Sequence, residues 1–506
     1  MITRVVLIAL LVLCAAPAFA RPKPKIKLEW RETTYESGKL QEKYTVSVVE
    51  GGGETLWGEY TEYWENGQKK RAGKHEDGKR IERWEWWHAN GERMQSGFYD
   101  VGVQWNDWTT WHENGKKASD GKYADGKRHD KWVWYWPSGK KKEETYFEMG
   151  AKHGRNVRWH ENGNRSAQGE WDNDKLDGRW DWWHDNGKPR TSGKYENGEK
   201  AGKWESWYAD GIKSEQHEYK GPERTGAWKT WWDNGNIKSE GEAFNDLRHG
   251  RWIFHHIVGI KEAEGDYDNG KRTGAWTFWH DNTAKRAAGE YAEGMQTGGW
   301  TFWHDNGKKF TQGSMVQGER TGNWVTWHDN GEKAVEAAFD GDMLVGGWVR
   351  YWPNGQKAAE GAYQGGVEHG DWTWFHDNGQ IAEKGRFDQG GKAGPWSSWH
   401  RNGSLAGHGS YEGYLRHGLW EYWHDDGSRR LSANYKGGKK DGTWTWYYKG
   451  GKLRAQGTFK DDWLHGWYRE HDANGQVLFE KFYQEGYESD PPKEEQEEDK
   501  DEEDAG

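Results

Sequence analysis

Histidine is the first side chain whose type and spacing could do chemistry in this sequence. Eleven histidines hold the same place in a 24-residue period: His88, His112, His160, His184, His256, His280, His304, His328, His376, His400 and His424. Imidazole is the commonest metal ligand, but its nitrogen must lie about 2.0–2.1 Å from the ion. Equivalent residues two strands apart lie roughly 10 Å from each other, too far to share one ion. Trp136, Tyr208, Trp232 and Trp352 fill the same slot, so we predict stacked structural rings and no metal site.

The acidic residues and nucleophiles give no better catalytic constellation. The chain has no Gly-x-Ser-x-Gly elbow and no phosphate-binding loop, and its one cysteine is Cys14. Aspartates recur beside the repeated turn, as at Asp281, Asp305 and Asp329, where Asp commonly forms turns. One stretch, "RWIFHHIVGIKEAEG" (251–265), departs from the pattern, and we interpret it as a diverged repeat with a tighter apolar turn. We therefore expect no enzyme and no cofactor.

The composition requires an unusual core. The 506 residues include 41 Trp and 72 Gly but only 10 Pro, and the formal net charge is −11. Leu, Ile and Val are scarce, so aromatic rings must supply the buried surface. A single domain of this length would be unusual, which favours a repeat architecture.

A period of 24 residues organises the chain without insertions. The turn glycine of "DNG" or "ENG" fills 17 of 18 slots from Gly67 to Gly475, and only Thr283 departs. Seven residues before that slot stands a first ring, which is Trp in 15 of 18 cases. The segments "GAWTFWHDN" (274–282) and "GGWTFWHDN" (298–306) show the pattern. Such regularity indicates a tandem array.

Each unit is predicted to be a β-hairpin, because Asn-Gly between β-rich runs is typical of a two-residue type I′ turn. A turn at Asn306-Gly307 makes the numbers of paired residues sum to 613. By this arithmetic the first rings of this unit and of the preceding one each face a glycine, a socket that the ring can cover. The predicted structural pairs are Trp300 with Gly313, Trp276 with Gly289, and Tyr291 with Gly274; Met315 takes the tyrosine's place opposite Gly298.

Alternation along the strand puts a second ring on the opposite face. We predict that this face binds a partner through Trp183, Trp231, Trp279, Trp303 and Trp327. The same arithmetic gives most of these rings a cationic neighbour, an arrangement worth ~0.5–1 kcal/mol when exposed. The predicted cationic pairs are Trp183–Arg190, Trp231–Lys238, Trp279–Arg286 and Trp423–Arg430, whereas Trp111 meets Ala118.

The ends of the chain differ from the array. Residues 1–20 have the charged, apolar and small-residue regions of a cleaved secretory signal, and nine apolar residues are too few to span a bilayer. We expect an N-terminal cap over 21–57, the array of about 18 repeats over 58–475 and a C-terminal cap over 476–487. Residues 488–506 carry eleven acids against two lysines and should be a disordered tail.

The unit "GKWESWYADGIKSEQHEYKG" (202–221) resembles the MORN-variant repeat. Such arrays are common in bacterial proteins labelled YwqK-type antitoxins, and the resemblance covers about residues 55–487. It implies successive hairpins that serve as an interaction scaffold, with lipid binding proposed for some members. An export signal fits poorly with an antitoxin that neutralises a cytoplasmic toxin.

The sequence therefore predicts an all-β protein of tandem 24-residue hairpins, which form an elongated antiparallel sheet or an open solenoid. We expect it to be exported to the periplasm, the outer cell envelope or the extracellular space, with no transmembrane segment once the signal is removed. The predicted function is a non-enzymatic scaffold for an unknown protein partner. Binding of cell-wall glycan through the Trp rows, or an antitoxin or immunity role by resemblance, are the alternatives. The nearly neutral body has no basic stripe, so no nucleic-acid partner is expected.

Overall fold

The computed structural model describes residues 26–492, and all of its regular elements are β-strands, 39 in number. The predicted signal segment and residues 493–506 of the predicted tail lie outside the described residues. The strands fall into two compact units, one up to Gly226 and one from Ala227 onward. Within residues 26–492 there is no helix of the length and apolarity needed to cross a bilayer.

The strands of the first unit follow each other at intervals of about half a repeat. They are β1 (Ile26–Thr34), β2 (Leu40–Val49), β3 (Glu54–Tyr63), β4 (Lys69–Glu76), β5 (Lys79–Trp87), β6 (Arg93–Asp100), β7 (Val103–Trp111), β8 (Lys117–Ala124), β9 (Lys127–Tyr135), β10 (Lys141–Glu148), β11 (Ala151–Trp159), β12 (Arg165–Asp172), β13 (Lys175–Trp183), β14 (Pro189–Glu196), β15 (Glu199–Trp207) and β16 (Lys213–Lys220). The boundary between the units falls inside β17 (Glu223–Trp231).

The second unit continues the same spacing. Its strands are β18 (Ile237–Phe244), β19 (Leu247–His255), β20 (Lys261–Asp268), β21 (Lys271–Trp279), β22 (Lys285–Ala292), β23 (Met295–Trp303), β24 (Lys309–Val316), β25 (Glu319–Trp327), β26 (Lys333–Asp340), β27 (Met343–Tyr351), β28 (Lys357–Gln364), β29 (Val367–Phe375), β30 (Ile381–Asp388), β31 (Gly391–Trp399), β32 (Leu405–Glu412), β33 (Leu415–Trp423), β34 (Arg429–Lys436), β35 (Lys439–Tyr447), β36 (Leu453–Lys460), β37 (Trp463–His471), β38 (Val477–Gln484) and β39 (Tyr487–Glu488).

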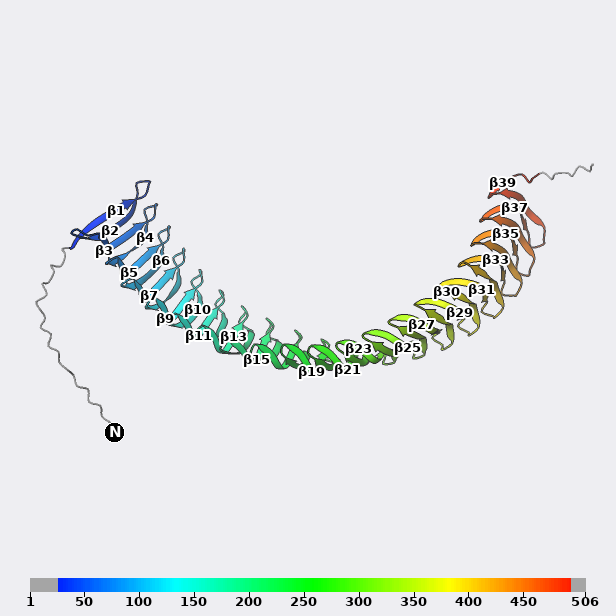
Figure 1. Cartoon of the computed structure of the whole chain (residues 1–506), viewed down its shortest axis with the longest axis horizontal. Coiled ribbons are helices and arrows are strands. Elements are labelled where there is room, and N and C mark those ends of the chain that lie inside the picture. Colours follow the sequence, from blue (N-terminus) through cyan, green and yellow to red (C-terminus); the bar gives the residue numbers. More distant parts are fainter. Residues whose placement is uncertain (1–25, 493–506) are drawn as a thin grey trace, which may run out of the picture. The chain divides into compact units, whose positions relative to one another are not determined.

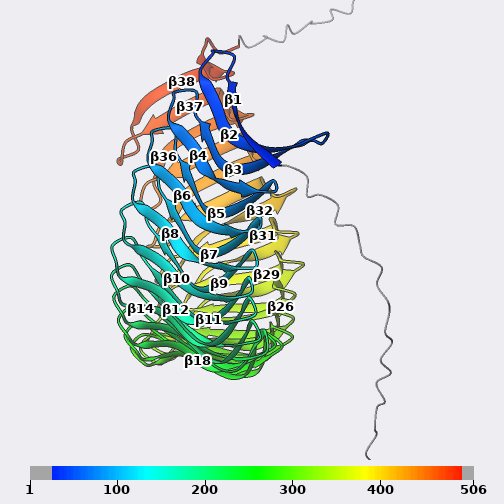
Figure 2. The same ribbon diagram turned by 90° about the vertical axis from the view of Figure 1, so that its left-hand side faces the viewer.

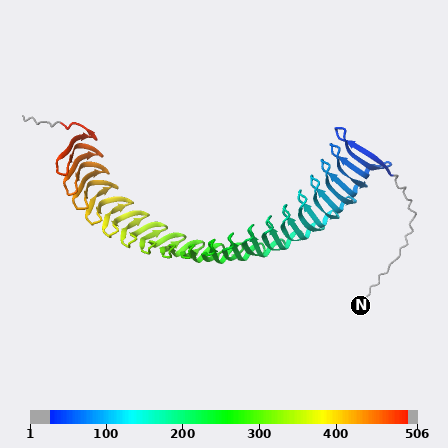
Figure 3. The same cartoon turned by 180° about the vertical axis from the view of Figure 1, so that it is seen from behind.

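Each unit is an open antiparallel sheet in which successive strands lie side by side (Figure 1). Seen from the front and from behind, neither a helix nor a second sheet covers the described strands of either unit (Figure 3). The connections alternate between the two margins of each sheet, as the strands of the first unit show in Figure 2. All burial in these units must therefore come from side chains that lie flat on their own sheet.

The two margins carry different turns, and one expectation is wrong. At the "HDNG" turn the amide of Gly307 donates to the carbonyl of His304 at 3.0 Å, and that of His304 donates to the carbonyl of Lys308 at 2.8 Å. Only Gly307 in this turn has a positive φ, 81°, so the loop is a three-residue turn ending in a left-handed glycine rather than type I′. The type I′ turns lie at the other margin, where Glu293 and Gly294 both have positive φ (51° and 85°).

The predicted register nevertheless describes the middle of each hairpin. Trp300 pairs with Gly313 and Gly298 with Met315, while Trp276 pairs with Gly289 and Gly274 with Tyr291. Next to the turn the register changes, because Trp303 pairs with Lys309 and Phe302 with Thr311. The turn is one residue longer than a type I′ turn, and Phe310 has no partner in the opposite strand. The unpaired Phe310 offsets the longer turn, so the pairing from Phe302 onward is the predicted one.

Between hairpins a larger irregularity recurs. Ala288 pairs with Thr301 and Glu290 with Thr297, so that three residues of β23 oppose Gly289 of β22. The bulged strand passes through Gly298, whose φ is +64°. This bulge bends the chain locally and lowers the following Trp300 onto the neighbouring strand.

Candidate binding faces of the repeat array

The first row of rings forms the core by contact between repeats. A Cβ built on Gly289 would lie 2.3 Å from the ring of Trp300, and one on Gly265 would lie 2.3 Å from the ring of Trp276. Trp300 Nε1 donates to the carbonyl of Glu290 at 3.1 Å. Both tryptophans are only 1% exposed. Each ring therefore lies over the glycine of the preceding repeat.

This geometry corrects the predicted sockets. Gly289 is opposite Trp276 in the register, yet the ring that covers it belongs to Trp300. Gly274 is opposite Tyr291 but has no heavy atom within 4 Å of its added Cβ. Its φ of +62° is the reason for glycine there, because an L-residue in that region costs roughly 1–2 kcal/mol.

In one repeat both the ring and its glycine are replaced by other residues. Thr145 stands where the socket glycine belongs, and the residue eleven positions later is Asn156 instead of Trp. Both side chains are fully buried, and the Asn156 amide donates to the Thr145 hydroxyl. In this repeat a hydrogen-bonded pair thus replaces the ring and its glycine.

The rings of the first face cover one another. Trp276 stacks on Phe278 with ring centroids 5.7 Å apart, and it meets Tyr267 edge-on at 5.2 Å. The guanidinium of Arg272 lies 4.5 Å above the Trp276 ring and donates to the Tyr291 hydroxyl at 3.1 Å. Stacking, edge-on and cation contacts together close this face of an uncovered sheet.

The second row lies on the opposite face at the strand ends and stays half-buried. Trp183, Trp231, Trp279, Trp303 and Trp327 all occupy this row and are all partly exposed. A row of large rings on a face with no covering layer is a candidate binding surface. We call the part formed by Trp279, Trp303 and Trp327 the Trp row patch.

The cations beside these rings are not the predicted ones. Lys261, Lys285 and Lys309 lie over Trp279, Trp303 and Trp327 at 5.1, 5.9 and 5.4 Å. Each lysine comes from the preceding repeat. Within its own hairpin Trp279 pairs with Lys285 and not with the predicted Arg286, because the register changes beside the turn. Arg286 lies over Phe278, Arg430 over Tyr422 and Lys238 over Trp232. Trp183 pairs with Pro189, not Arg190, and Trp111 with Lys117, not Ala118.

The charge of the second face varies along the row. Beside Trp279, Lys261 pairs with Glu264 at 2.7 Å. Burial alone would raise the pKa of Glu264, but Lys261 and Arg251 outweigh it and the pKa lies below its usual value. Lys285 and Lys309 are exposed and form no ion pair within residues 26–492; Lys309 instead donates to Gln312 at 2.8 Å. The Trp row patch therefore carries two lysines that form no ion pair within the described residues.

The repeated histidines join adjacent repeats. Nε2 of each of the eleven lies 2.9–3.4 Å from the carbonyl of the residue 23 positions later, as His280 does at 3.1 Å from Trp303. A carbonyl only accepts, so Nε2 carries the hydrogen. Trp136, Trp232 and Trp352 make the same bond through Nε1. The slot needs a donor ring, and no group of three or more potential metal ligands gathers within residues 26–492.

The irregular segment 251–265 keeps the ordinary repeat structure. Trp252 is fully buried and stacks on Phe254 at 5.9 Å. The turn has the usual bonds, from Gly259 to the His256 carbonyl at 2.8 Å and from His256 to the Ile260 carbonyl at 2.9 Å. The predicted tighter turn is wrong, because these two bonds are those of the ordinary turn; the apolar Val258 at its tip is 64% exposed.

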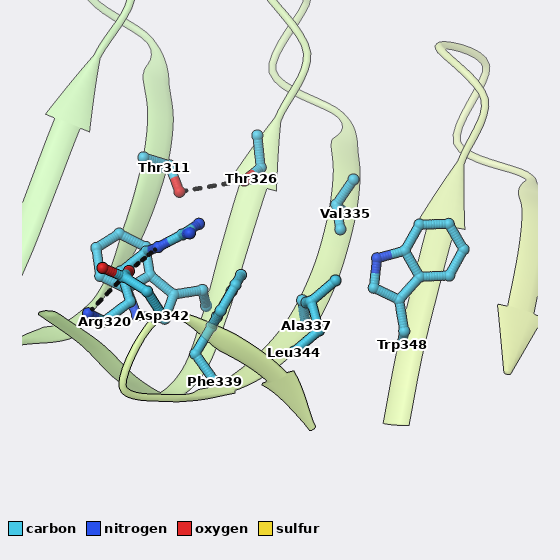
Figure 4. A pocket seen from close by; sticks show the side chains of 10 residues that line it. Thr311, Arg320, Thr326, Val335, Ala337, Phe339, Asp342, Leu344 and Trp348 are labelled. Carbon is cyan, nitrogen blue, oxygen red and sulfur yellow. Dashed lines mark hydrogen bonds and ion pairs between the residues drawn. The ribbon is translucent and has the colours of Figure 1, made fainter. Parts of the chain in front are cut away.

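A different departure from the repeat opens a pocket of about 350 Å³ on the first face (Figure 4). Its walls include Trp324, Thr326, Ala337, Leu344 and Trp348. Thr326 stands one repeat after Phe302, Ala337 one repeat after Gly313 and Leu344 one repeat after Arg320.

Sequence reasoning missed this site, although the signal was present in the repeat. The three substitutions fall on three strands, β25, β26 and β27. Only alignment of the repeats in space places them around one cavity.

Comparison with known protein families identifies the repeat. Four segments match the family described as MORN repeat variant, at residues 131–149, 224–245, 368–389 and 440–461. No curated protein matches the chain.

Solved structures give weaker likenesses. The crystal structures of TcdB2-TccC3 and of TcdB2-TccC3-Cdc42 each share 11% identity with this chain at a TM-score of 0.13, covering 88% and 89% of it. A structure of the Photorhabdus luminescens Tc holotoxin pore shares 9% identity at a TM-score of 0.12 and covers 90%. The chain spans 30–31% of the length of these chains. At TM-scores this low, the likeness identifies neither a common fold nor a function.

Proposed function

We propose that this chain of MORN-variant repeats is an exported, non-enzymatic scaffold of the bacterial cell envelope, which binds a protein partner through the Trp row patch. The observation that carries the proposal is the half-buried ring row on a face that no described helix or strand covers. Tryptophan dominates the energy of many protein interfaces because it buries a large area with little loss of side-chain freedom.

The charges next to the row suggest the chemistry of the partner. Lys285 and Lys309 lie beside Trp303 and Trp327 with no ion-pair partner in the described part of the chain. A surface with apolar rings and two unneutralised lysines favours a partner that presents carboxylates around an apolar patch. Such binding should weaken as the salt concentration rises.

Stability measurements test whether the row is a surface or part of the core. Trp276→Ala removes a fully buried ring and should cost ~3–5 kcal/mol. Trp279→Ala should cost much less, because its ring is partly solvated in the free protein. Urea denaturation followed by circular dichroism measures both losses. Equal losses would mean that both rows are core and that the proposed surface does not exist.

Retention of envelope components tests the partner class. The mature protein and a variant with Trp279, Trp303 and Trp327 all changed to Ala are immobilised and exposed to envelope extract and to purified peptidoglycan. We expect one salt-sensitive protein on the wild type and not on the variant. Trp159→Ala is the matched control, since Lys141 lies over this ring and pairs with Glu144. Retention of peptidoglycan alone would favour the glycan-binding alternative, and equal retention by all variants would contradict both.

A further inference from the structure

The pocket at β25–β27 lies in a place that several other repeats fill with a ring of their own. Phe278 lies between Trp276 and Trp300, with ring centroids 5.7 and 6.3 Å away. Trp374 lies in the same way between Trp372 and Trp396, at 5.6 and 5.6 Å. The position equivalent to Phe278 and Trp374 in the pocket is Thr326, which has no ring.

The stack of rings is interrupted there. Phe302 stacks toward Trp324 at 6.5 Å, and the next ring contact on this face within the described residues joins Trp348 to Tyr363 at 6.1 Å. Trp348 is partly exposed, whereas Trp324 is 4% exposed. The pocket therefore has a buried indole on one side and a half-exposed indole on the other.

The remaining walls suit a flat apolar group with a polar edge. Val335, Ala337 and Leu344 line the floor, and the Thr311 and Thr326 hydroxyls lie 3.1 Å apart at one side (Figure 4). The indole nitrogen of Trp348 is drawn on the side facing Val335 and has no hydrogen-bond partner within residues 26–492, unlike Trp324, which donates to the Ser314 carbonyl at 3.1 Å.

The opposite rim is held in place by a cation and a carboxylate. The Arg320 guanidinium lies 4.0 Å above the Phe339 ring, and its Nε donates to Asp342 at 2.7 Å. This pair fixes Phe339 and Arg320 at the mouth. The volume of about 350 Å³ is at the small end of ligand pockets.

We infer that this pocket binds a planar aromatic ring with a hydrogen-bonding substituent, a phenol or an indole, in the place where other repeats insert their own ring. The guest ring contacts Trp324 and Trp348 as Phe278 contacts Trp276 and Trp300. Trp348 Nε1 donates to the substituent, and the threonine hydroxyls contact its polar edge. The inference does not depend on the Trp row patch, which lies on the other face.

Fluorine NMR of 4-fluorophenol mixed with the mature protein tests the inference. We expect line broadening that saturates with protein concentration, and displacement by indole. Thr326→Phe places the missing ring in the pocket and should abolish the broadening while raising Tm. Ser398→Phe, in the equivalent slot three repeats later, is the matched control and should leave binding unchanged.

Two further measurements decide the class and the source of the ring. Cyclohexanol, which is not planar, should fail to displace 4-fluorophenol. A Gly-(3-fluorotyrosine)-Gly peptide that binds comparably would assign the pocket to a side chain of a partner, and binding of the free phenol alone would assign it to a small molecule. Displacement by cyclohexanol, no broadening with the wild type, or unchanged broadening with Thr326→Phe would each overturn the inference.

Discussion

At the scale of single residues, the fold depends on glycines that have distinct tasks. Gly289 leaves room for the Trp300 ring, Gly274 supplies a left-handed backbone, and Gly299 has neither a positive φ nor a heavy atom near its added Cβ. Glycine recurs at the first two positions in most repeats, whereas Ala275 and Asn323 stand where Gly299 does in the neighbouring repeats. Their different roles become visible only when the neighbouring strand is in place.

Gly289→Val tests the first task. Its side chain meets the Trp300 ring, which has no free space to move into, so we expect a loss of roughly 1–3 kcal/mol from overpacking. Urea denaturation monitored by circular dichroism measures the loss. Gly299→Ala is the control and should change stability little. A Gly289→Val protein as stable as the control would show that the ring does not need its socket.

His75 should make the first unit sensitive to acid. Burial of the ring, helped by the charges of Arg80 and Arg71, lowers its pKa to about 4 from an ordinary 6.5. Between pH 6.5 and pH 4 the unfolded chain therefore binds a proton at His75 that the folded chain does not bind. Stability that is present above pH 6.5 is lost as the pH falls from 6.5 toward 4. His75→Tyr retains a ring, as at Tyr99 one repeat later, and should reduce the loss between pH 7 and pH 4.5 in urea denaturation. An equal acid loss in both proteins would refute the assignment to His75.

At the scale of hairpins and turns, much of the structure was predictable. The 24-residue period and the strand alternation gave the hairpins, the two faces and the pairing of Trp276 with Gly289. The turn type was wrong because Asn-Gly serves two loop lengths, and a strand bulge hides the difference by restoring the register. The partners of the second ring row were wrong for the same reason. The register change beside the turn places Lys285 instead of Arg286 opposite Trp279, and Lys261 of the preceding repeat lies over the ring.

Adjacent hairpins are joined by hydrogen bonds from ring N–H groups, whereas the sequence pattern predicted only stacked rings at these positions. His280→Phe keeps a ring but removes the bond to the Trp303 carbonyl, so we expect a loss of about 0.5–1.5 kcal/mol. His280→Trp keeps a donor of the kind found at Trp232 and should retain most of the stability. Denaturation midpoints of the two variants measure the difference. Equal midpoints would restore the simpler view that any flat ring suffices.

At the scale of the whole molecule, stability is a sum over neighbours. Contacts such as Trp300 on Gly289 and His280 on Trp303 link a repeat to the next one and no further. Repeat proteins with this property unfold locally, so one transition does not describe the chain. The pocket at Thr326 marks a place inside the second unit where one such link lacks its ring.

Amide hydrogen exchange should make this locality visible. In Gly289→Val, protection should fall in the repeats around residues 265–313 and stay unchanged in distant repeats, including β5–β9 of the first unit. Mass spectrometry of peptides along the chain resolves the pattern. A uniform loss of protection would mean that the repeats unfold as one cooperative body.

The links between repeats also bear on how such a chain changes in length over evolutionary time. Every regular repeat presents a glycine socket to the repeat that follows and a main-chain carbonyl to the repeat that precedes it. A duplication or deletion of 24 codons therefore joins surfaces that already match, whereas a gain of any other length separates a tryptophan from its socket. Recombination between repeated DNA segments can thus lengthen or shorten the gene in whole steps, and each viable step leaves the remaining joints as they were.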